Sequence, residues 1–309
     1  MVTTSLAAAF LARHVGPGVG TVIPLTHGEW SRAYAFSHDA REYIVRFSAL
    51  NEDFRKDRLA LRFAAPSLPI PAIIEIGETD GGFYAISERV PGGFLDNLNE
   101  TGMRAMLPSL FAALDAMRET DLADTTGYGI WGADGHAPHP TWRTALLDIA
   151  NDRPGDRIHG WREHLAASPV GSGPFDEAYE RLRTLSEHGP EERHLIHSDL
   201  LNFNVLVEDG RITGVIDWGC AMYGDFLYDL AWFAFWAPWY PAWRGIDFVA
   251  TARQHYADIG IAVPNFAQRL TCCQIHIGLA GMAYQAYTET WDLLAETTAR
   301  TLEVARSVP

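Results

Sequence analysis

The chain is 309 residues long, and its 39 acidic residues outnumber its 24 basic residues, which gives a net charge of −15 with histidine neutral. Its 48% hydrophobic and 20% charged residues are typical of a folded protein, and this length suffices for two lobes with cores of their own. The acidity argues against a nucleic-acid binder and against adhesion to an anionic membrane surface, because both need basic residues. The partner that the charge favours is a cationic small molecule.

The cysteine content and the hydropathy pattern favour a soluble protein of a reducing compartment. Cys220, Cys272 and Cys273 give no disulfide framework. The first ten residues lack a basic segment before their short apolar run, so they do not resemble a signal peptide. The most apolar later stretch, residues 228–243, is too short to span a bilayer. We therefore expect a cytoplasmic protein without a membrane segment, present as a monomer.

The hydrophobic periodicity predicts a small antiparallel sheet with one packed helix, followed by a mainly helical region. The predicted elements, in chain order, are a helix over residues 5–14, strands over 21–25, 32–37 and 42–47, a helix over 53–65, and strands over 72–76 and 83–88. A hairpin near residue 210 is the exception to the later helical pattern. We expect an α+β protein of two lobes, with an N-terminal nucleotide-binding lobe of residues 1–90 and a C-terminal catalytic and substrate-binding lobe of residues 91–309.

Residues 197–219 contain the predicted hairpin. Strand-like runs at residues 205–207 and 212–216 flank Asp209 and Gly210. This pair forms a two-residue hairpin loop of the kind that tolerates positive φ.

The simplest register of this hairpin brings Asn204 and Asp217 to the same face. In that register Asn204 faces Val215, and Asp217 lies two residues farther along the same strand. A diagonal pair of this kind has its β-carbons about 7 Å apart. An amide oxygen and a carboxylate oxygen at that separation can share one magnesium ion.

Asp199 lies five residues before Asn204, in the loop that enters the hairpin. Phosphoryl transfer needs a hard cation to neutralise the triphosphate and a free carboxylate to orient and deprotonate the attacking hydroxyl. We therefore predict Mg²⁺ ligands at Asn204 and Asp217 and a catalytic base at Asp199. His197 is interpreted as a brace that holds this loop through hydrogen bonds.

The motif His197-x-Asp199-x4-Asn204, with Asp217-x-Gly219 after it, resembles the catalytic and metal-binding motifs of the aminoglycoside phosphotransferase and choline kinase-like family, which is related to the protein kinases. Other runs are similar to the members that act on hygromycin B: Lys56-Asp57-Arg58, Leu68-Pro69-Ile70-Pro71, Thr141-Trp142-Arg143, Arg193-His194-Leu195-Ile196-His197, Gly210-Arg211-Ile212-Thr213 and Trp236-Ala237-Pro238-Trp239. The resemblance covers residues 25–239 and implies a two-lobed kinase-like fold that binds ATP between its lobes. The resemblance likewise implies that Asp199 is the catalytic base and that Asn204 and Asp217 are the Mg²⁺ ligands.

The resemblance also implies nucleotide-binding residues in the first 90 residues. Backbone groups of Glu88 and Val90 match the hinge that hydrogen-bonds adenine. Residues 28–34 match the loop that covers the phosphates, with Ser31 as its polar contact.

The chain departs from the kinase pattern in its third strand, where the usual phosphate-binding lysine is replaced by Arg46. The period of two puts Arg46 opposite the apolar face formed by Tyr43, Val45 and Phe47. An arginine can fork onto two phosphate oxygens, so we predict Arg46 as the phosphate contact. Lys56, the only lysine, lies in the next helix beside Asp57, near the usual position of the helix glutamate, and it is the alternative. This departure leaves open whether ATP or GTP is preferred.

The residues that contact the substrate are less defined. The aromatic residues between Trp218 and Trp243 are interpreted mainly as core, with Trp236 and Trp239 as candidates for a substrate wall because prolines end the helix there. The sequence does not decide which carboxylate contacts an amine of the substrate. The four candidates are Asp225, Asp229, Glu289 and Asp292. Asp225 is also a good candidate for a helix N-cap.

The resemblance implies an ATP- and Mg²⁺-dependent O-phosphotransferase that acts on an aminoglycoside-type antibiotic, with hygromycin B as the expected acceptor. Such an enzyme confers antibiotic resistance by phosphorylation. Two alternatives stay open: a kinase of the same fold that acts on a macrolide, choline or a sugar, and a pseudokinase that binds nucleotide without turnover. The intact set of Asp199, Asn204 and Asp217 argues against the pseudokinase.

Overall fold

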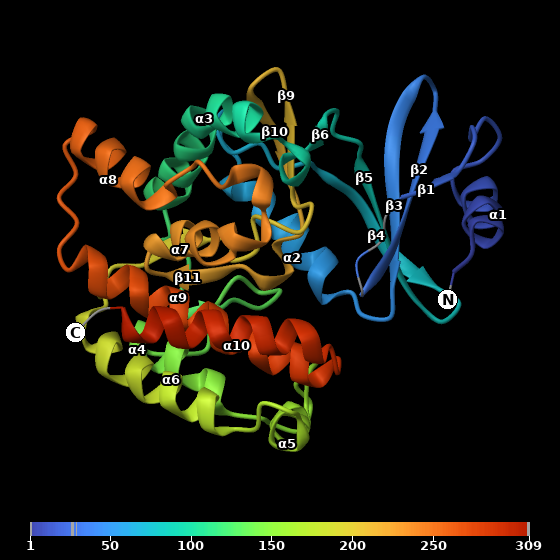
Figure 1. Ribbon diagram of the computed structural model, residues 1–309. Coiled ribbons are helices and arrows are strands. Elements are labelled where there is room, and N and C mark those ends of the chain that lie inside the picture. Colours follow the sequence, from blue (N-terminus) through green and yellow to red (C-terminus); the bar gives the residue numbers. More distant parts are fainter. Residues whose placement is uncertain (1, 26–27, 29, 308–309) are drawn as a thin grey trace. The chain divides into compact units, whose positions relative to one another are not determined.

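The alternating runs near the start of the chain form a five-stranded antiparallel sheet in the computed structural model, which describes residues 2–25, 28 and 30–307. The strand order is β1-β2-β3-β5-β4, and the strands are labelled in Figure 1. The strands are β1 (Ile23–Pro24), β2 (Ser31–His38), β3 (Arg41–Ser48), β4 (Ile73–Thr79) and β5 (Gly82–Glu88). The structure confirms the strand runs predicted from the sequence and their antiparallel pairing.

One face of this sheet packs against helix α1 (Thr4–His14). Val45 and Phe47 of β3 are buried there, together with Ala7 and Leu11 of the helix. The remaining members of the cluster come from β2 and β5: Tyr34, Phe36, Tyr84 and Ile86. The predicted alternation of β3 is therefore confirmed, and it leaves Arg46 out of this apolar cluster.

Helix α2 (Glu52–Ala60) and one 3-10 turn, Leu61–Phe63, lie between β3 and β4 in the chain. The helix predicted over residues 53–65 is thus confirmed in outline, although its regular α-helical part ends sooner. Phe54, Lys56 and Asp57 are buried on α2, so this short helix places two charged side chains in the interior. Both take part in the candidate site.

Chain contacts divide the protein into two compact units. The first unit comprises Met1–Asn97, Gly132–Gly135 and Phe203–Gly219, and the second comprises Leu98–Trp131, His136–Asn202 and Cys220–Pro309. In the first unit, a further sheet of order β10-β9-β6 is formed by β6 (Gly93–Phe94), β9 (Val205–Glu208) and β10 (Arg211–Val215). A functional boundary at residue 90 stays a prediction.

The second unit is mainly helical, as expected. Its helices are α3 (Glu100–Glu119), α4 (Trp142–Leu147), α5 (Trp161–Ala167), α6 (Gly173–Leu185), α7 (Leu227–Trp236), α8 (Phe248–Asp258), α9 (Phe266–Tyr287) and α10 (Trp291–Arg306). Helix α9 contacts α5, α6, α7 and α10 (Figure 1). It is buried along most of its length, as expected of a helix that is apolar on all sides.

The sequence did not predict a small sheet in the second unit. Its strands β7 (Gly129–Ile130), β8 (His194–Ile196) and β11 (Met222–Gly224) pair in the order β7-β11-β8. Runs of two or three residues are too short to show an alternating pattern. The prediction that only the hairpin near residue 210 interrupts the helices is therefore wrong.

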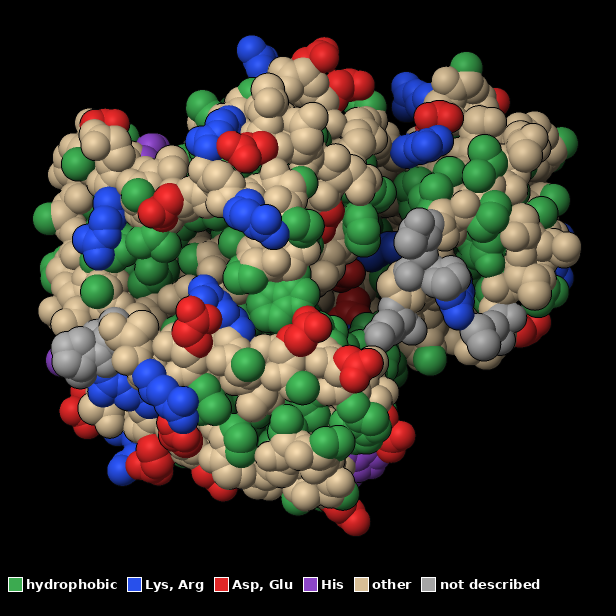
Figure 2. Space-filling model, in the orientation of Figure 1, with side chains coloured by type: hydrophobic (Ala, Val, Ile, Leu, Met, Phe, Trp, Pro, Cys, Tyr) green, Lys and Arg blue, Asp and Glu red, His purple; other side chains and the backbone are tan. Residues whose placement is uncertain are grey.

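None of the helices in the described residues combines the length and apolar character needed to cross a lipid bilayer. On the face that Figure 2 shows, acidic and basic side chains are interspersed with each other and with apolar ones.

Gly224 of β11 offers a test of the packing in the second unit. A Cβ at this position would overlap the buried indole ring of Trp142, which is the first residue of α4. We expect Gly224→Ala to lower the free energy of unfolding by about 2 kcal/mol through overpacking. Denaturant unfolding measures this loss. Gly173→Ala is the matched control, since a Cβ at Gly173 meets nothing within 4 Å; equal stability of the two variants would contradict the prediction.

Candidate functional site

The side chain of Asp57 on α2 connects β3 to the segment that follows β10. One carboxylate oxygen accepts a hydrogen bond from the Arg46 guanidinium, with which it forms an ion pair. The other accepts the Trp218 N–H at 2.7 Å. The Arg46 guanidinium also lies 5.0 Å from the centroid of the Phe54 ring, so an aromatic face shields it. Arg46 therefore has the helix carboxylate partner that a kinase-like site requires.

Lys56, next to Asp57, holds the following residue of the same segment. Its ammonium donates to the carbonyl of Gly219, and its side chain is almost completely buried. Two consecutive residues of α2 thus contact the two residues that follow Asp217. The expectation that Asp57 lies near the position of the helix glutamate agrees with its pairing to Arg46.

Asp217 is exposed to solvent, but its carboxyl lies in a strongly charged environment. Desolvation by the neighbouring protein atoms and the nearby carboxylates of Asp57 and Asp53 raise its pKa to about 6, although Arg46 and the Gly219 N–H act in the opposite direction. Burial lowers the pKa of Arg46, but Asp57, Asp217 and Asp53 outweigh this effect and leave that pKa above its ordinary value. A carboxylate in this environment would be stabilised by an additional cation.

The hairpin has a different register from the one predicted. Val207 faces Ile212 as expected, but the register shifts after Ile212, so that Gly214 faces Leu206 and Val215 faces Val205. The expected pair of Asn204 with Val215 is therefore wrong. A β-bulge adds one residue to β10, and a bulge leaves no mark in a short alternating run.

This shift changes how Asp217 is oriented relative to Asn204. The Ile216 N–H donates to the Asn204 carbonyl at 2.9 Å, so Ile216 is the residue beside Asn204. Asp217 has a φ of 62°, in the left-handed region, which breaks the strand alternation. Its orientation is set by this backbone turn, not by the period of two. The hairpin loop itself is as predicted, with positive φ at Asp209 and Gly210.

The donor set of Asn204 and Asp217 fits a magnesium ion. Both residues are in the first unit, and both supply oxygen ligands, which Mg²⁺ prefers. The Asn204 side chain is buried, whereas Asp217 is exposed to solvent and thus open to an ion. Within the described residues, no group of three or more His, Cys, Asp or Glu side chains could hold a metal ion. An ion bound here would take its remaining ligands from water and phosphate, as Mg²⁺ commonly does.

Asp199 belongs to a tightly held loop of the second unit. The N–H groups of His197 and Ser198 donate to the two carboxylate oxygens of Asp229 at 2.9 and 2.8 Å. The Asp199 N–H donates to Nδ1 of His197 at 3.2 Å, which supports the interpretation of this buried histidine as a brace. The Asp199 carboxylate accepts from the Asn202 side chain at 2.6 Å and remains partly exposed.

Strained backbone is concentrated in the predicted motif. Ser198, Asn202, Phe203 and Asp217 all have φ between 62° and 66°. The left-handed region costs non-glycine residues free energy, and such residues gather at functional sites because surrounding contacts hold them there. The contacts in this case include the Ser198 hydroxyl, which donates to the Cys220 carbonyl at 2.7 Å. The Phe203 N–H likewise donates to Asp96 at 3.1 Å.

The predicted adenine-binding residues lie at the end of β5. The Glu88 N–H donates to the Ala72 carbonyl at 3.3 Å, and the Arg89 N–H donates to the Glu42 carbonyl at 3.1 Å. Among residues 2–25, 28 and 30–307, nothing accepts a hydrogen bond from the Val90 N–H. This group is therefore available to a ligand.

Ser31 is the first residue of β2 and faces Ser48 of β3. The predicted phosphate-covering loop, residues 28–34, lies partly outside the described residues, since Glu29 does. The same is true of His27 in the preceding turn.

The candidate carboxylates for a substrate amine differ in their partners. Asp225 forms a buried ion pair with Arg269 and accepts the Leu227 N–H at 3.0 Å near the start of α7. Asp229 holds the loop described above. Glu289 is exposed and lies 3.5 Å from Nδ1 of His164.

The candidate aromatic wall is at the end of α7. Trp236 and Trp239 lie edge to face, with their ring centroids 5.0 Å apart. The Trp239 indole N–H donates to Glu296 of α10 at 3.0 Å. This contact gives the aromatic pair an acidic neighbour that sequence analysis missed.

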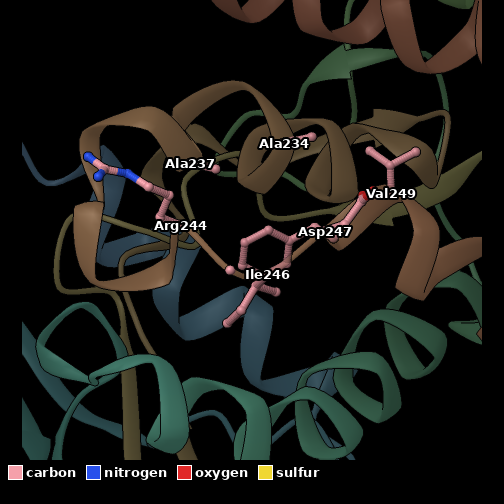
Figure 3. A pocket seen from close by; sticks show the side chains of 8 residues that line it. Ala234, Ala237, Arg244, Ile246, Asp247 and Val249 are labelled. Atoms are coloured by element: carbon pink, nitrogen blue, oxygen red, sulfur yellow. The ribbon is translucent and has the colours of Figure 1, made fainter.

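A cavity of about 280 Å³ lies beside this region, between the end of α7 and the start of α8 (Figure 3). It is lined by Ala234, Ala237, Arg244, Gly245, Ile246, Asp247, Phe248 and Val249. None of the site residues predicted from the sequence lines it. The cavity therefore adds nothing to their assignment.

Comparisons with known proteins show which proteins the chain is similar to. A family model described as the phosphotransferase enzyme family matches residues 21–266. Among curated proteins, hygromycin-B 4-O-kinase of Escherichia coli is 38% identical over 223 residues, which are 72% of this chain and 64% of that protein. The match thus spans less than two thirds of the length of this curated relative.

Solved structures match over nearly the whole chain. The crystal structure of aminoglycoside phosphotransferase APH(4)-Ia has a TM-score of 0.86 at 31% identity and covers 99% of this chain and 100% of that one. A thermostable mutant of that enzyme, in a ternary complex with AMP-PNP and hygromycin B, has a TM-score of 0.84 at 32% identity and covers 97% of both chains. The likeness confirms the kinase-like α+β fold expected from the sequence.

The contact between Asp229 and the loop predicts a pH-dependent stability. Burial raises the pKa of Asp229 to about 7, from 3.8 in an exposed carboxyl, although two N–H donors lower it. The folded protein therefore holds a proton that the unfolded chain has lost, and the contribution of Asp229 to the free energy of unfolding falls as pH rises from about 4 to about 7. We expect the stability of wild type relative to Asp229→Asn to fall by up to about 1.4 kcal/mol per pH unit in this window. Denaturant unfolding of both proteins across the window measures it; a constant difference would contradict the prediction.

Proposed function

The chain belongs to the phosphotransferase enzyme family, and from this premise we propose that it is a magnesium-dependent kinase that transfers the γ-phosphoryl group of ATP to a hydroxyl of an aminoglycoside. The proposed acceptor is hygromycin B, on the basis of the 38% identity to hygromycin-B 4-O-kinase. The observation that carries the proposal is the cluster in the first unit, where α2 holds both Arg46 and the segment after Asp217. The net charge of −15 supports a cationic substrate.

In this proposal, residues 1–90 bind the nucleotide. Adenine hydrogen-bonds to the Glu88 carbonyl and the Val90 N–H, and the Ser31 hydroxyl contacts the phosphates. Arg46 binds the α- and β-phosphates with the donors that Asp57 does not use, because a guanidinium has five N–H donors in a fixed fork. GTP stays open as an alternative to ATP.

Asn204 and Asp217 are the proposed ligands of Mg²⁺, which would neutralise the charge of the triphosphate when bound. Asp199, within residues 91–309, is the proposed base. It orients the acceptor hydroxyl and takes its proton as the oxygen bonds to the γ-phosphorus and the bond to the β–γ bridging oxygen breaks, so that ADP leaves. Asp229 keeps Asp199 in place by holding the N–H groups of His197 and Ser198.

The proposal is tested by the ATP consumption of the purified protein with Mg²⁺, with and without hygromycin B, beside kanamycin, erythromycin and choline. We expect stimulation by hygromycin B and a loss of turnover of about 100-fold or more in Asp199→Asn, since a general base contributes that much. ATP affinity stays unchanged in this variant. Asp209→Asn is the matched control, because Asp209 is exposed in the hairpin loop and has a positive φ that asparagine tolerates.

The outcomes separate the candidates. Stimulation by choline or erythromycin alone would contradict the aminoglycoside substrate. Undiminished turnover in Asp199→Asn would contradict the base assignment. Tight ATP binding without turnover on any acceptor would favour a pseudokinase.

The role of Arg46 gives a separate prediction. Arg46→Ala removes the proposed phosphate contact, so it should weaken ATP binding at least about 10-fold and leave adenosine binding unchanged. Arg46→Lys should recover part of the loss, because it retains the charge but not the fork. Titration calorimetry with ATP and adenosine measures both; equal losses for the two ligands would show that Arg46 does not contact phosphate.

A further inference from the structure

The single lysine of the chain has an unusual environment. Lys56 is 1% exposed, although lysine is rarely buried without a specific partner. Its ammonium donates to a backbone carbonyl, that of Gly219, which is 163 residues away in the sequence. From this contact we infer that Lys56 is a positioning residue for metal-dependent nucleotide binding, because it fixes the turn that carries Asp217. The inference rests on the proposed function of this site.

The turn is held by contacts at each of its peptide groups. Asp57 accepts the Trp218 N–H at 2.7 Å, and Lys56 donates to the Gly219 carbonyl. The Gly219 N–H bonds back to the Asp217 carboxylate, and Asp217 itself has a φ of 62°. Contacts from one helix therefore maintain a backbone conformation that the chain would otherwise leave. The orientation of the Asp217 carboxylate follows from that conformation.

The turn also has little space to move. A Cβ on Gly219 would lie 3.1 Å from the carboxyl carbon of Asp53 and 3.3 Å from Oδ1 of Asp217. The Cα of Gly219 is therefore packed closely against Asp53 of α2. A shift away would break the contact with Lys56. The ammonium thus sets the distance between α2 and the turn.

Stability alone does not account for a buried ammonium. Burying a charge is costly even when it is hydrogen-bonded, and apolar replacements of buried charges are often neutral or stabilising. A carbonyl at this position could instead be satisfied by a neutral donor. The placement of Lys56 beside a proposed metal ligand indicates a role in positioning that ligand. Residues that do not bind the metal themselves but orient its ligands commonly raise metal affinity by roughly 10- to 100-fold.

Three binding measurements test the inference: adenosine, ATP in EDTA, and ATP with Mg²⁺, each by titration calorimetry. In Lys56→Met we expect the gain in ATP affinity that Mg²⁺ produces to fall about 10-fold. Binding of adenosine and of metal-free ATP should stay within about a factor of two of wild type, since Lys56 contacts neither in this proposal. Lys56→Arg should restore most of the gain, because arginine keeps a charged donor.

The control is Arg55→Met, which removes a charge from the exposed face of the same helix. It should leave all three affinities unchanged. If Lys56→Met does not fold, Lys56→Gln makes the same test with a polar side chain. Thermal unfolding of each variant establishes that it is folded.

Two results would overturn the inference. An equal loss for metal-free ATP and for ATP with Mg²⁺ would make Lys56 a direct phosphate contact. If Mg²⁺ raises the ATP affinity of folded Lys56→Met as much as that of wild type, Lys56 has no role in positioning Asp217. Failure of the proposed function is seen separately, as the absence of phosphoryl transfer to hygromycin B by wild type, since the binding measurements need no acceptor.

Discussion

The carboxylate of Asp57 is the interaction on which the rest of the candidate site depends. Its two oxygens bind different parts of the chain, the Arg46 guanidinium on β3 and the Trp218 N–H after β10. Breaking either contact would leave a buried polar group without its partner, and such groups are costly in a low-dielectric interior. One side chain therefore couples the strand proposed to bind phosphate to the turn proposed to bind the metal. A kinase-like site requires this coupling, and here an arginine and an aspartate provide it.

The same cluster explains why this part of the protein suits a polyanion with its metal. Asp53, Asp57 and Asp217 are close enough to Arg46 to change its pKa, and Lys56 is next to Asp57 in α2. Three carboxylates thus lie near the Arg46 guanidinium. Desolvation, together with the carboxylates of Asp57 and Asp53, raises the pKa of Asp217 in spite of Arg46. A divalent ion bound here would add positive charge beside these carboxylates, and the phosphates of a nucleotide would balance the ion.

The sequence predicted those features that depend on local patterns. The alternation of β3 and the Asp209-Gly210 loop are confirmed, because each is encoded in neighbouring residues. The bulge in β10 and the short strands β7, β8 and β11 were missed, since neither produces a periodic signal. The contacts of Lys56 and Asp229 were missed for another reason: they join residues far apart in sequence. The motif named the candidate ligands and base, and their roles stay predictions.

The burial of Lys56 has a consequence for the chemistry of the whole chain. Because this sequence contains no other lysine, its only side-chain amine lies inside the folded protein. Reagents that acylate amines, and proteases that cleave after lysine, can reach Lys56 only when α2 separates from the turn at Gly219. The rate of such a modification therefore reports local opening of this one region. A ligand that stabilises the contact between α2 and the turn would slow the modification. The modification rate of Lys56 therefore measures how often this contact opens.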